Sequence, residues 1–240
     1  MSAQKKLGII QSRGLGDLII ALPIAGHYRD QGYEILWPIL DHFVPSMQSM
    51  APWVKWIPIP FDAPGRYFYD IPMKRLQNFK CDEILPLYQA LTGHPEFSDE
   101  KYFQYTSFDQ YKYIRAGVPF LKKWDLRGYI TRHDDREDKL FRAKVTNPNY
   151  AVLHLQGSDI RAIFDPSIIP SDWQVIEILE EPGVLLGDWL KIISQAQSII
   201  CIDSVYANLV DQLGLGEDRY FIQRSHMGLT PVQGQHWHWL

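Results

Sequence analysis

The stretch LGIIQSRGLGDLIIALPIAGHY, residues 7–28, decides the fold of this chain. It begins with a short apolar run that ends at Ile10 and is typical of a central strand in a parallel sheet. Gly14 and Gly16 permit a tight turn, and Asp17 follows where a helix is expected to begin. Apolar residues then continue almost without interruption, which predicts a largely buried helix. A strand, a glycine turn and a buried helix are the opening of an α/β layer fold.

The glycine turn allows more than one interpretation. A dinucleotide-binding fingerprint needs a third glycine, but Ile19 occupies that position. Asp17 would also place a carboxylate where the pyrophosphate should bind, so an oxidoreductase is the weaker interpretation. Alternatively, Asp17 lies above the carboxyl edge of the sheet and points into the crevice where such folds carry out chemistry. Spacing alone does not separate this role from simple helix capping, which aspartate often performs.

Two segments far apart in the chain carry a family resemblance. They are GLGDLIIALPIAGHYRDQGYEI, residues 14–35, and LLGDWLKIISQAQSIICIDSVYANLVDQLG, residues 185–214. Both are similar to segments of glycosyltransferase family 9, the heptosyltransferase-like enzymes, and they occur in the family's order. The resemblance implies two Rossmann-like domains of the GT-B type with a cleft between them. It also implies that Asp17 matches the aspartate understood as the general base that deprotonates the acceptor hydroxyl.

Composition bounds the class of protein. The chain has 240 residues, of which 46% are hydrophobic, enough for one large core or two small ones. Its net charge of -4 gives no overall attraction to nucleic acid or to an anionic membrane. Only Cys81 and Cys201 occur, so we expect buried thiols and no disulfide framework. No apolar run approaches the roughly 18 residues of a membrane span and the start lacks the form of a signal peptide, so we expect a cytoplasmic protein without a transmembrane segment.

Strand-like and helical segments alternate along the first half of the chain, which indicates a mostly parallel sheet. Pro58 cannot donate a hydrogen bond to a neighbouring strand, so the segment that contains it should be an edge strand. After the first strand, further strands are predicted at 33–40, 53–59 and 82–87.

A charged helix followed by Asn147, Pro148 and Asn149 marks the predicted domain boundary near residue 146. We therefore expect an N-terminal Rossmann-like acceptor domain over 1–146 and a C-terminal Rossmann-like nucleotide-sugar-binding domain over 147–240. The second domain is short for the family, so we expect it to be reduced, lacking some peripheral helices or strands.

The loop after the strand predicted at 150–155 is one candidate donor site. Gly157 and Ser158 offer backbone N–H groups at the end of a parallel strand, and Arg161 can bind a phosphate through two hydrogen bonds. The resembled family commonly has a lysine before a Trp-Pro pair in this loop, and that pair is absent here. An ordinary surface loop with an exposed arginine is the alternative interpretation.

The segment IICIDSVYANL, residues 199–209, is a second candidate donor site. Its apolar residues predict a strand that delivers Asp203 and Ser204 to the start of a helix, where the hydroxyl and the free N–H groups can bind a pyrophosphate. Asp203 can accept hydrogen bonds from sugar hydroxyls. Asn208 stands where family members often have histidine, and it cannot supply a proton or a positive charge. Arg224, just past the last strand, is a further candidate contact, and helix capping is the alternative role for Asp203 and Ser204.

The motifs and the resemblance together predict an inverting, metal-independent glycosyltransferase. A nucleotide-sugar is the expected donor, and Arg13, Gly14 and Gly16 form the acceptor-side loop. The resemblance implies that no cofactor or metal ion is needed, and no acidic D-x-D pair placed to hold an ion contradicts this. His236 and His238 are a weak metal signal, and we expect this aromatic tail to pack across the domain junction.

The acceptor stays open between a glycan, a lipid-linked glycan and a modified DNA base, as in phage glycosyltransferases. Only the aromatic and basic stretch 97–136 favours DNA, because aromatic side chains can stack on bases; a packing surface is the other interpretation of that stretch. A non-catalytic nucleotide-sugar-binding protein is an alternative of another class.

Overall fold

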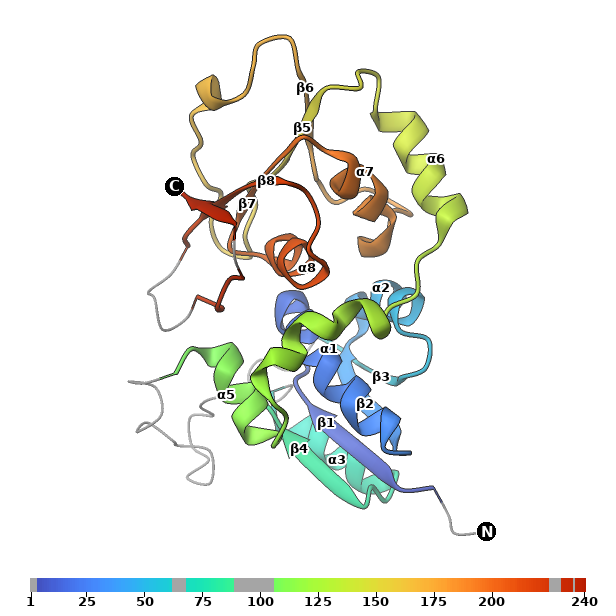
Figure 1. Cartoon of the computed structure of the whole chain (residues 1–240). Helices are drawn as coiled ribbons and strands as arrows, with labels where there is room; N and C mark the ends of the chain where they lie inside the picture. The colour runs from blue at the N-terminus through green and yellow to red at the C-terminus, as the bar shows by residue number, and fades with distance from the viewer. Residues whose placement is uncertain (1–3, 62–67, 89–105, 225–229, 235) are drawn as a thin grey trace. The chain divides into compact units, whose positions relative to one another are not determined.

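The structure is a computed structural model of the whole chain, and it describes residues 4–61, 68–88, 106–224, 230–234 and 236–240. These residues form two compact units, each built on a parallel sheet (Figure 1). Unit 1 runs to Thr131 and includes Val232, whereas unit 2 begins at Arg132 and includes the residues from Gln233 on. The predicted α/β class with two parallel sheets is confirmed.

Unit 1 contains a four-stranded sheet in the order β3-β2-β1-β4, and all its strand pairs are parallel. The predicted central position of the first strand and the edge position of the strand with Pro58 are both confirmed. Its elements are β1 (Lys6–Ile10), α1 (Leu15–Asp30), β2 (Glu34–Leu40), η1 (Asp41–Phe43), α2 (Val44–Met50), β3 (Lys55–Ile59), α3 (Asp70–Asn78), β4 (Glu83–Pro86), α5 (Phe108–Arg115) and η3 (Phe120–Gly128).

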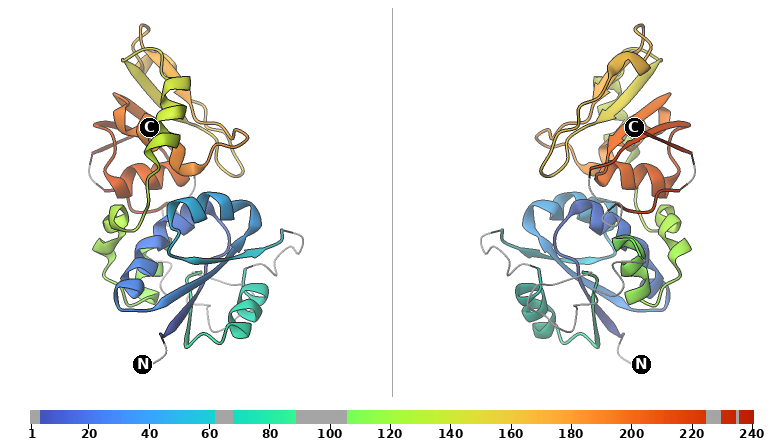
Figure 2. Two further views of the ribbon diagram at one scale, coloured as in Figure 1. Left: turned by 90° about the vertical axis from the view of Figure 1, so that its right-hand side faces the viewer. Right: turned by 90° about the vertical axis from the view of Figure 1, so that its left-hand side faces the viewer.

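Helices cover both faces of this sheet. The helix α1 is buried from Leu18 to Gly26 and contacts β2, α5 and η3. On the other face α3 places Leu76 against Ile10 of β1, and Gly8 permits this approach because a Cβ there would lie 2.8 Å from the Leu76 side chain. Figure 2 shows the sheet between α1 and α3. Connections that cross a parallel sheet in opposite directions place their helices on opposite faces, as observed here.

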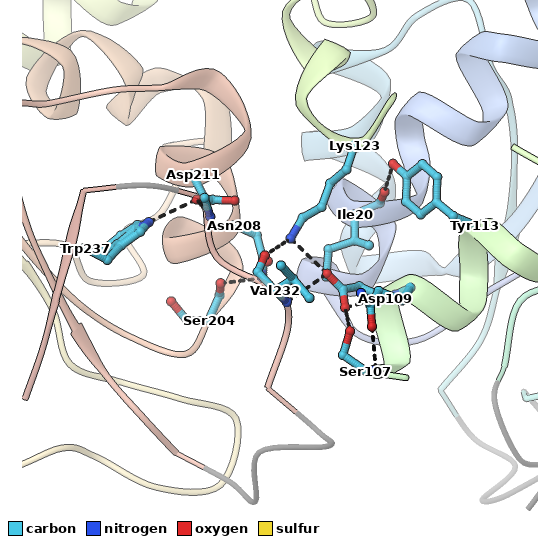
Figure 3. A network of polar contacts seen from close by, with 12 residues as sticks. Ile20, Ser107, Asp109, Tyr113, Lys123, Ser204, Asn208, Asp211, Val232 and Trp237 are labelled. Atoms are coloured by element: carbon cyan, nitrogen blue, oxygen red, sulfur yellow. Dashed lines mark hydrogen bonds and ion pairs between the residues drawn. The ribbon is translucent and has the colours of Figure 1, made fainter. Parts of the chain in front are cut away.

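An ion pair between Asp109 and Lys123 lies in the interior of unit 1 (Figure 3). Both side chains are fully buried, and the Lys123 Nζ atom is 2.9 Å from Asp109 Oδ2. That same oxygen accepts the backbone N–H of Val232 at 3.0 Å, and Lys123 donates to the Val232 carbonyl oxygen. The Ser107 hydroxyl donates to the other carboxylate oxygen. The pair therefore forms hydrogen bonds with both backbone polar groups of Val232, a residue near the end of the chain, and holds it on unit 1.

We predict that Lys123→Met lowers the free energy of unfolding by about 3–5 kcal/mol, because it leaves the Asp109 carboxylate buried without its counter-charge. The matched control is Lys122→Met, which removes an exposed partner of Asp125 and should change stability little. Urea denaturation of both variants measures the difference. Equal transition midpoints for the two variants would show that the buried pair does not stabilise unit 1.

Unit 2 contains a five-stranded parallel sheet in the order β6-β5-β7-β8-β9. The strands predicted at 150–155, within 199–209 and just before Arg224 are all present, with bounds that differ by a few residues. Its elements are α6 (Asp134–Lys144), β5 (Tyr150–His154), η4 (Pro166–Ile168), β6 (Gln174–Glu177), η5 (Leu186–Trp189), α7 (Leu190–Gln195), β7 (Ser198–Ile202), α8 (Val205–Leu213), β8 (Asp218–Ile222) and β9 (Trp237–Trp239).

The connection from β5 to β6 contains only the short helix η4 in place of a full crossover helix. Its side chains cover the sheet instead: Phe164, Ile169 and Trp173 pack with Leu153 of β5 and Ile200 of β7. In this segment apolar loop residues bury the sheet face that a helix would otherwise cover. The reduction of the second domain relative to the family stays a prediction.

The aromatic tail pairs with β8 as the parallel strand β9. The expectation that it packs across the domain junction stays a prediction. Trp237 and Trp239 lie against Phe221, with ring centroids 5.7 and 4.8 Å apart, which explains the pairing. His238 lies beside Asp218 at 3.4 Å. The tail is therefore an edge strand of the unit 2 sheet.

The division between the units falls before α6, whereas the predicted domain boundary near residue 146 follows it. The helix α6 groups with unit 2 because it contacts η5 and α7, and Arg136 on α6 binds the Asp188 carboxylate through Nε at 2.8 Å and Nη2 at 2.6 Å. The boundary between independently folding domains stays a prediction. Cys201 is buried and Cys81 partly buried, and both are free thiols.

Candidate functional site

In both sheets the strand order reverses beside the first strand of the unit. In unit 1, β2 lies on one side of β1 and β4 on the other; in unit 2, β6 and β7 flank β5 in the same way. Ligands of open parallel sheets bind at the carboxyl ends of the strands at such a reversal, because the loops there diverge and leave a crevice. The predicted site residues lie in the loops and helix starts at these two edges.

The turn after β1 places Asp17 in the first turn of α1. Gly14 is the N-cap residue of this helix with φ of 79°, and no side chain caps it, so the interpretation of Asp17 as the capping residue is wrong. A Cβ on Gly14 would lie 2.3 Å from Asp17 Oδ2, which explains the need for glycine here. Gly16 lies in the same first turn, and Arg13 is exposed with its guanidinium over the Phe68 ring, 5.4 Å from the centroid.

Asp17 forms an ion pair with Lys112 of α5, and the Lys112 Nζ atom lies 3.0 Å from Asp17 Oδ1. The lysine side chain is 3% exposed, whereas the aspartate side chain is 32% exposed. Lys112 was not predicted as a site residue from the sequence. Its only signal is a lysine on the same buried helix face as Asp109, at the i, i+3 spacing that places side chains together.

Tyr88 follows β4, the strand next to β1, and its hydroxyl binds the turn between β1 and α1. Its oxygen accepts the backbone N–H groups of Ser12 at 2.9 Å and of Arg13 at 3.1 Å, and it lies 3.1 Å from the Ser12 hydroxyl. Burial raises the pKa of Tyr88 to about 12, so the phenol stays protonated at neutral pH. Tyr88 therefore fixes the backbone that leads to Gly14.

Three of the predicted donor residues lie together at the carboxyl edge of unit 2. Arg224, after β8, donates from Nη1 to the Ser158 hydroxyl at 2.9 Å, and the same atom lies 3.3 Å from Asp159 Oδ1. A Cβ on Gly157 would lie 3.1 Å from Arg224 Cδ, so glycine gives the arginine room. Arg224 therefore lies across the loop that follows β5.

Arg161 does not join this cluster. Its guanidinium forms an ion pair with Glu177 of β6 at 2.6 Å, while half of the arginine side chain stays exposed. An isolated antiparallel bridge pairs Arg161 with Gln156 within the same loop. The carboxylate of Glu177 is thus the nearest anion to Arg161 that the structure describes.

The second predicted donor cluster lies at the start of α8. Ser204 is the N-cap residue, and its hydroxyl oxygen accepts the Ala207 N–H at 3.5 Å. Asp203, at the end of β7, is buried. Asn208 donates from Nδ2 to the Ser204 carbonyl at 2.9 Å, while its buried Oδ1 has no hydrogen-bond partner among the described residues.

His154 at the end of β5 contacts this candidate donor cluster, and it was not predicted from the sequence because it occupies an ordinary position in an apolar strand. Its Nδ1 atom lies 2.8 Å from Ser204 Oγ, and its ring packs on Tyr206 with centroids 4.7 Å apart. Burial lowers the pKa of His154 to about 4, so the imidazole is neutral at pH 7. It joins the loop after β5 to the start of α8.

The low pKa of His154 predicts a pH dependence of stability. The native imidazole takes up a proton only near pH 4, whereas the unfolded residue does so near its usual pKa of 6.5, so unfolding binds a proton between these values. This contribution, about 3 kcal/mol, is fully present above pH 6.5 and is lost as the pH falls toward 4. His154→Gln should remove that part of the slope in denaturant melts between pH 7 and 4, while the exposed control His42→Gln should keep it. A slope that is unchanged in His154→Gln would contradict the assignment.

The aromatic and basic stretch 97–136 was the reason to consider DNA as the acceptor. In its described part, residues 106–136, the structure gives DNA no support. Tyr111 and Tyr113 are buried, and Tyr113 donates to the Ile20 carbonyl at 2.9 Å, so these rings belong to the core. Arg132 is paired with Glu137, and Lys122 with Asp125. The aromatic residues from 97 to 105 lie outside the described residues.

Among the residues that the structure describes, no three His, Cys, Asp or Glu side chains come together as a metal site. Within the same residues, no helix combines the length and apolar character needed to cross a membrane.

No protein-family model and no curated protein matches the sequence. Solved structures match over nearly the whole chain. A glycosyltransferase family 9 structure from Veillonella parvula DSM 2008 has a TM-score of 0.62 and 13% identity, covering 100% of this chain and 88% of that one. The E. coli heptosyltransferase WaaC with ADP has a TM-score of 0.54 and 12% identity, covering 98% and 92%. The two parallel α/β units are therefore a fold that this chain shares with glycosyltransferases.

The iron-containing dodecameric glycosyltransferase TibC from enterotoxigenic E. coli H10407 is also similar, with a TM-score of 0.58 and 11% identity. The match covers 99% of this chain but 63% of TibC, so this chain corresponds to a part of that protein. At these identities the likeness defines the fold, and the chemistry must be argued from the residues.

Proposed function

We propose that the chain is a glycosyltransferase of the GT-B type that belongs to family 9 and transfers a sugar from a nucleotide-sugar to an acceptor hydroxyl. The observation that carries this proposal is the placement of complementary chemistry at the two strand reversals. Unit 1 presents a partly exposed carboxylate, Asp17, and unit 2 presents Ser204 at a helix start with Arg224 at the same sheet edge. In the GT-B arrangement the reaction takes place in a cleft between the two domains.

The donor's diphosphate is assigned to unit 2. The free N–H groups at the start of α8 and the Ser204 hydroxyl can bind its oxygens, and the positive end of the helix dipole favours its charge. Arg224 is the better placed cation, because Arg161 is paired with Glu177. The E. coli heptosyltransferase WaaC has been solved with ADP and with ADP-2-deoxy-2-fluoro heptose, which supports an ADP-sugar as the first donor to test.

The base is assigned to unit 1. Asp17 accepts the proton of the acceptor hydroxyl while that oxygen attacks the anomeric carbon, and the bond from this carbon to the diphosphate breaks. A single displacement of this kind inverts the configuration at the anomeric carbon. Ser204, the helix start and Arg224 stabilise the departing diphosphate, so the proposed reaction uses no metal ion. A glycan or lipid-linked glycan is the proposed acceptor class.

The donor is found with a thermal-shift screen against ADP-, UDP-, GDP- and CMP-sugars, with NAD and NADP alongside. A ligand that binds only the native state raises the melting temperature by mass action. A shift with one nucleotide-sugar supports the proposal and identifies the donor. A shift with NAD or NADP alone contradicts it and favours the oxidoreductase.

Asp17→Asn should affect mainly the transfer rate, whereas Ser204→Ala should affect mainly donor binding. Asp17→Asn should lower the release of nucleoside diphosphate by roughly 10²- to 10⁴-fold, as expected for a lost general base, with donor affinity within about twofold of the wild type. Ser204→Ala should weaken donor binding about tenfold through the loss of one hydrogen bond. Product release with water as the acceptor and calorimetric titration of the donor measure the two quantities.

Donor binding without release of nucleoside diphosphate by the wild-type chain would favour the alternative of a non-catalytic nucleotide-sugar-binding protein. Weakened donor binding in Asp17→Asn at an unchanged rate would reverse the assigned roles of the two units. Thermal unfolding of each variant establishes that it is folded under the assay conditions.

A further inference from the structure

The side chain of Lys112 is buried in unit 1, and its ammonium group is fully occupied. The Nζ atom donates to Gln11 Oε1 at 2.7 Å and to the Leu87 carbonyl at 3.2 Å, and it lies 3.0 Å from Asp17 Oδ1. These three oxygens match the three N–H groups of an ammonium. Because no N–H group is left over, Lys112 is not placed to bind a substrate anion directly.

The partners of Lys112 come from both sides of the strand reversal. Gln11 follows β1 and Leu87 follows β4, so the ammonium lies where the reversal opens the sheet edge. Gln11 is itself held by two hydrogen bonds. Its Nε2 atom donates to the Arg13 carbonyl at 2.8 Å, and its backbone carbonyl oxygen accepts the indole N–H of Trp37 at 2.9 Å. Gln11 and Leu87 thus fix the position of the Lys112 ammonium independently of Asp17.

Aromatic rings further restrict the lysine. The Nζ atom lies 5.4 Å from the centroid of Phe108 and 6.0 Å from that of Tyr88. Removing an ammonium from water costs several kcal/mol, and an apolar residue of similar volume often stabilises a fold at least as well as a buried ion pair. Stability alone therefore gives little reason for a lysine at this position.

The carboxylate of Asp17 is restricted from two sides. Lys112 binds Oδ1, while Oδ2 lies over Gly14, at a place where a Cβ would approach to 2.3 Å. Oδ2 has no partner among the residues that the structure describes, and a third of the side chain is open to solvent. The two oxygens are thus made unequal: one is bound and the other is available.

We infer that Lys112 is a positioning residue of the transfer reaction: it holds Oδ1 of Asp17 so that Oδ2 takes the proton of the acceptor hydroxyl. This inference rests on the proposed function, in which Asp17 is the base. The reacting hydroxyl gives its proton to Oδ2, its oxygen forms the new bond to the anomeric carbon, and the nucleoside diphosphate leaves with the electron pair of the broken bond. Lys112 keeps its three protons throughout.

The test is a double-mutant cycle on nucleoside diphosphate release from the nucleotide-sugar that shifts the melting temperature, with water as the acceptor. The variants are Asp17→Asn, Lys112→Met and their combination. Lys112→Met should lower kcat by about 10- to 100-fold, because a misplaced catalytic group loses rate of this order, while KM for the donor changes less than about twofold. In the Asp17→Asn background the same substitution should change kcat less than about twofold, because residues that act as a unit are not additive.

A matched control separates positioning from general loss of stability. Lys123→Met also removes the lysine of a buried ion pair in unit 1, but the aspartate of that pair is Asp109 and not Asp17. Measured at a temperature where all variants are folded, Lys123→Met should keep the wild-type kcat. Lys112→Arg, which retains a cation near Oδ1, should recover part of the rate that Lys112→Met loses.

The outcomes distinguish the two proposals. If Asp17→Asn is slow but Lys112→Met is as fast as the wild type, or is equally harmful in both backgrounds, the inference about Lys112 is wrong while the proposed base stands. Equal losses in Lys112→Met and Lys123→Met also overturn it. An unchanged rate in Asp17→Asn, or no release by the wild type from any of the nucleotide-sugars, overturns the proposed function itself.

Discussion

The reversal of strand order beside the first strand of each sheet is the constraint on which the rest of this structure depends. Parallel strands place all their carboxyl ends at one edge, and the reversal separates the loops there, so polar groups can gather over a hydrophobic sheet. In unit 1 the reversal lies between β1 and β4 and brings Gln11, Leu87 and Tyr88 together. In unit 2 it lies between β5 and β7 and brings His154 to Ser204.

The helix α5 contributes to the stability of unit 1 and, in the proposed reaction, to the chemistry. Asp109 and Lys112 lie one helical turn apart and are both buried. The partner of Asp109 is Lys123, which is also fully buried, so that pair is closed to solvent and holds the backbone of Val232. The partner of Lys112 is Asp17, which stays a third exposed. Lys112 and Lys123 are both buried lysines of unit 1, but only Lys112 is paired with a carboxylate that is partly open to solvent.

Local patterns predicted the elements well, but they did not predict the contacts between distant residues. The apolar run that ends at Ile10 and the following glycines were sufficient to predict β1, the turn and α1, and the Asp203-Ser204 pair predicted a helix start. Lys112 was missed because two of its partners, Gln11 and Asp17, are about a hundred residues away in the sequence. The ion pair of Arg161 with Glu177 and the pairing of the tail as β9 are likewise set by tertiary packing, which spacing does not encode.

The central claim is that unit 2 binds a nucleotide-sugar at the start of α8 while the turn at Gly14 serves the acceptor. A crystal structure of the wild-type chain with ADP, and with the nucleotide-sugar that raises its melting temperature, tests this most directly. We expect density for the diphosphate within hydrogen-bonding distance of the Ser204 hydroxyl and the first N–H groups of α8. Diphosphate density at the turn between β1 and α1, against Gly14 and Asp17, would contradict it and assign nucleotide binding to unit 1.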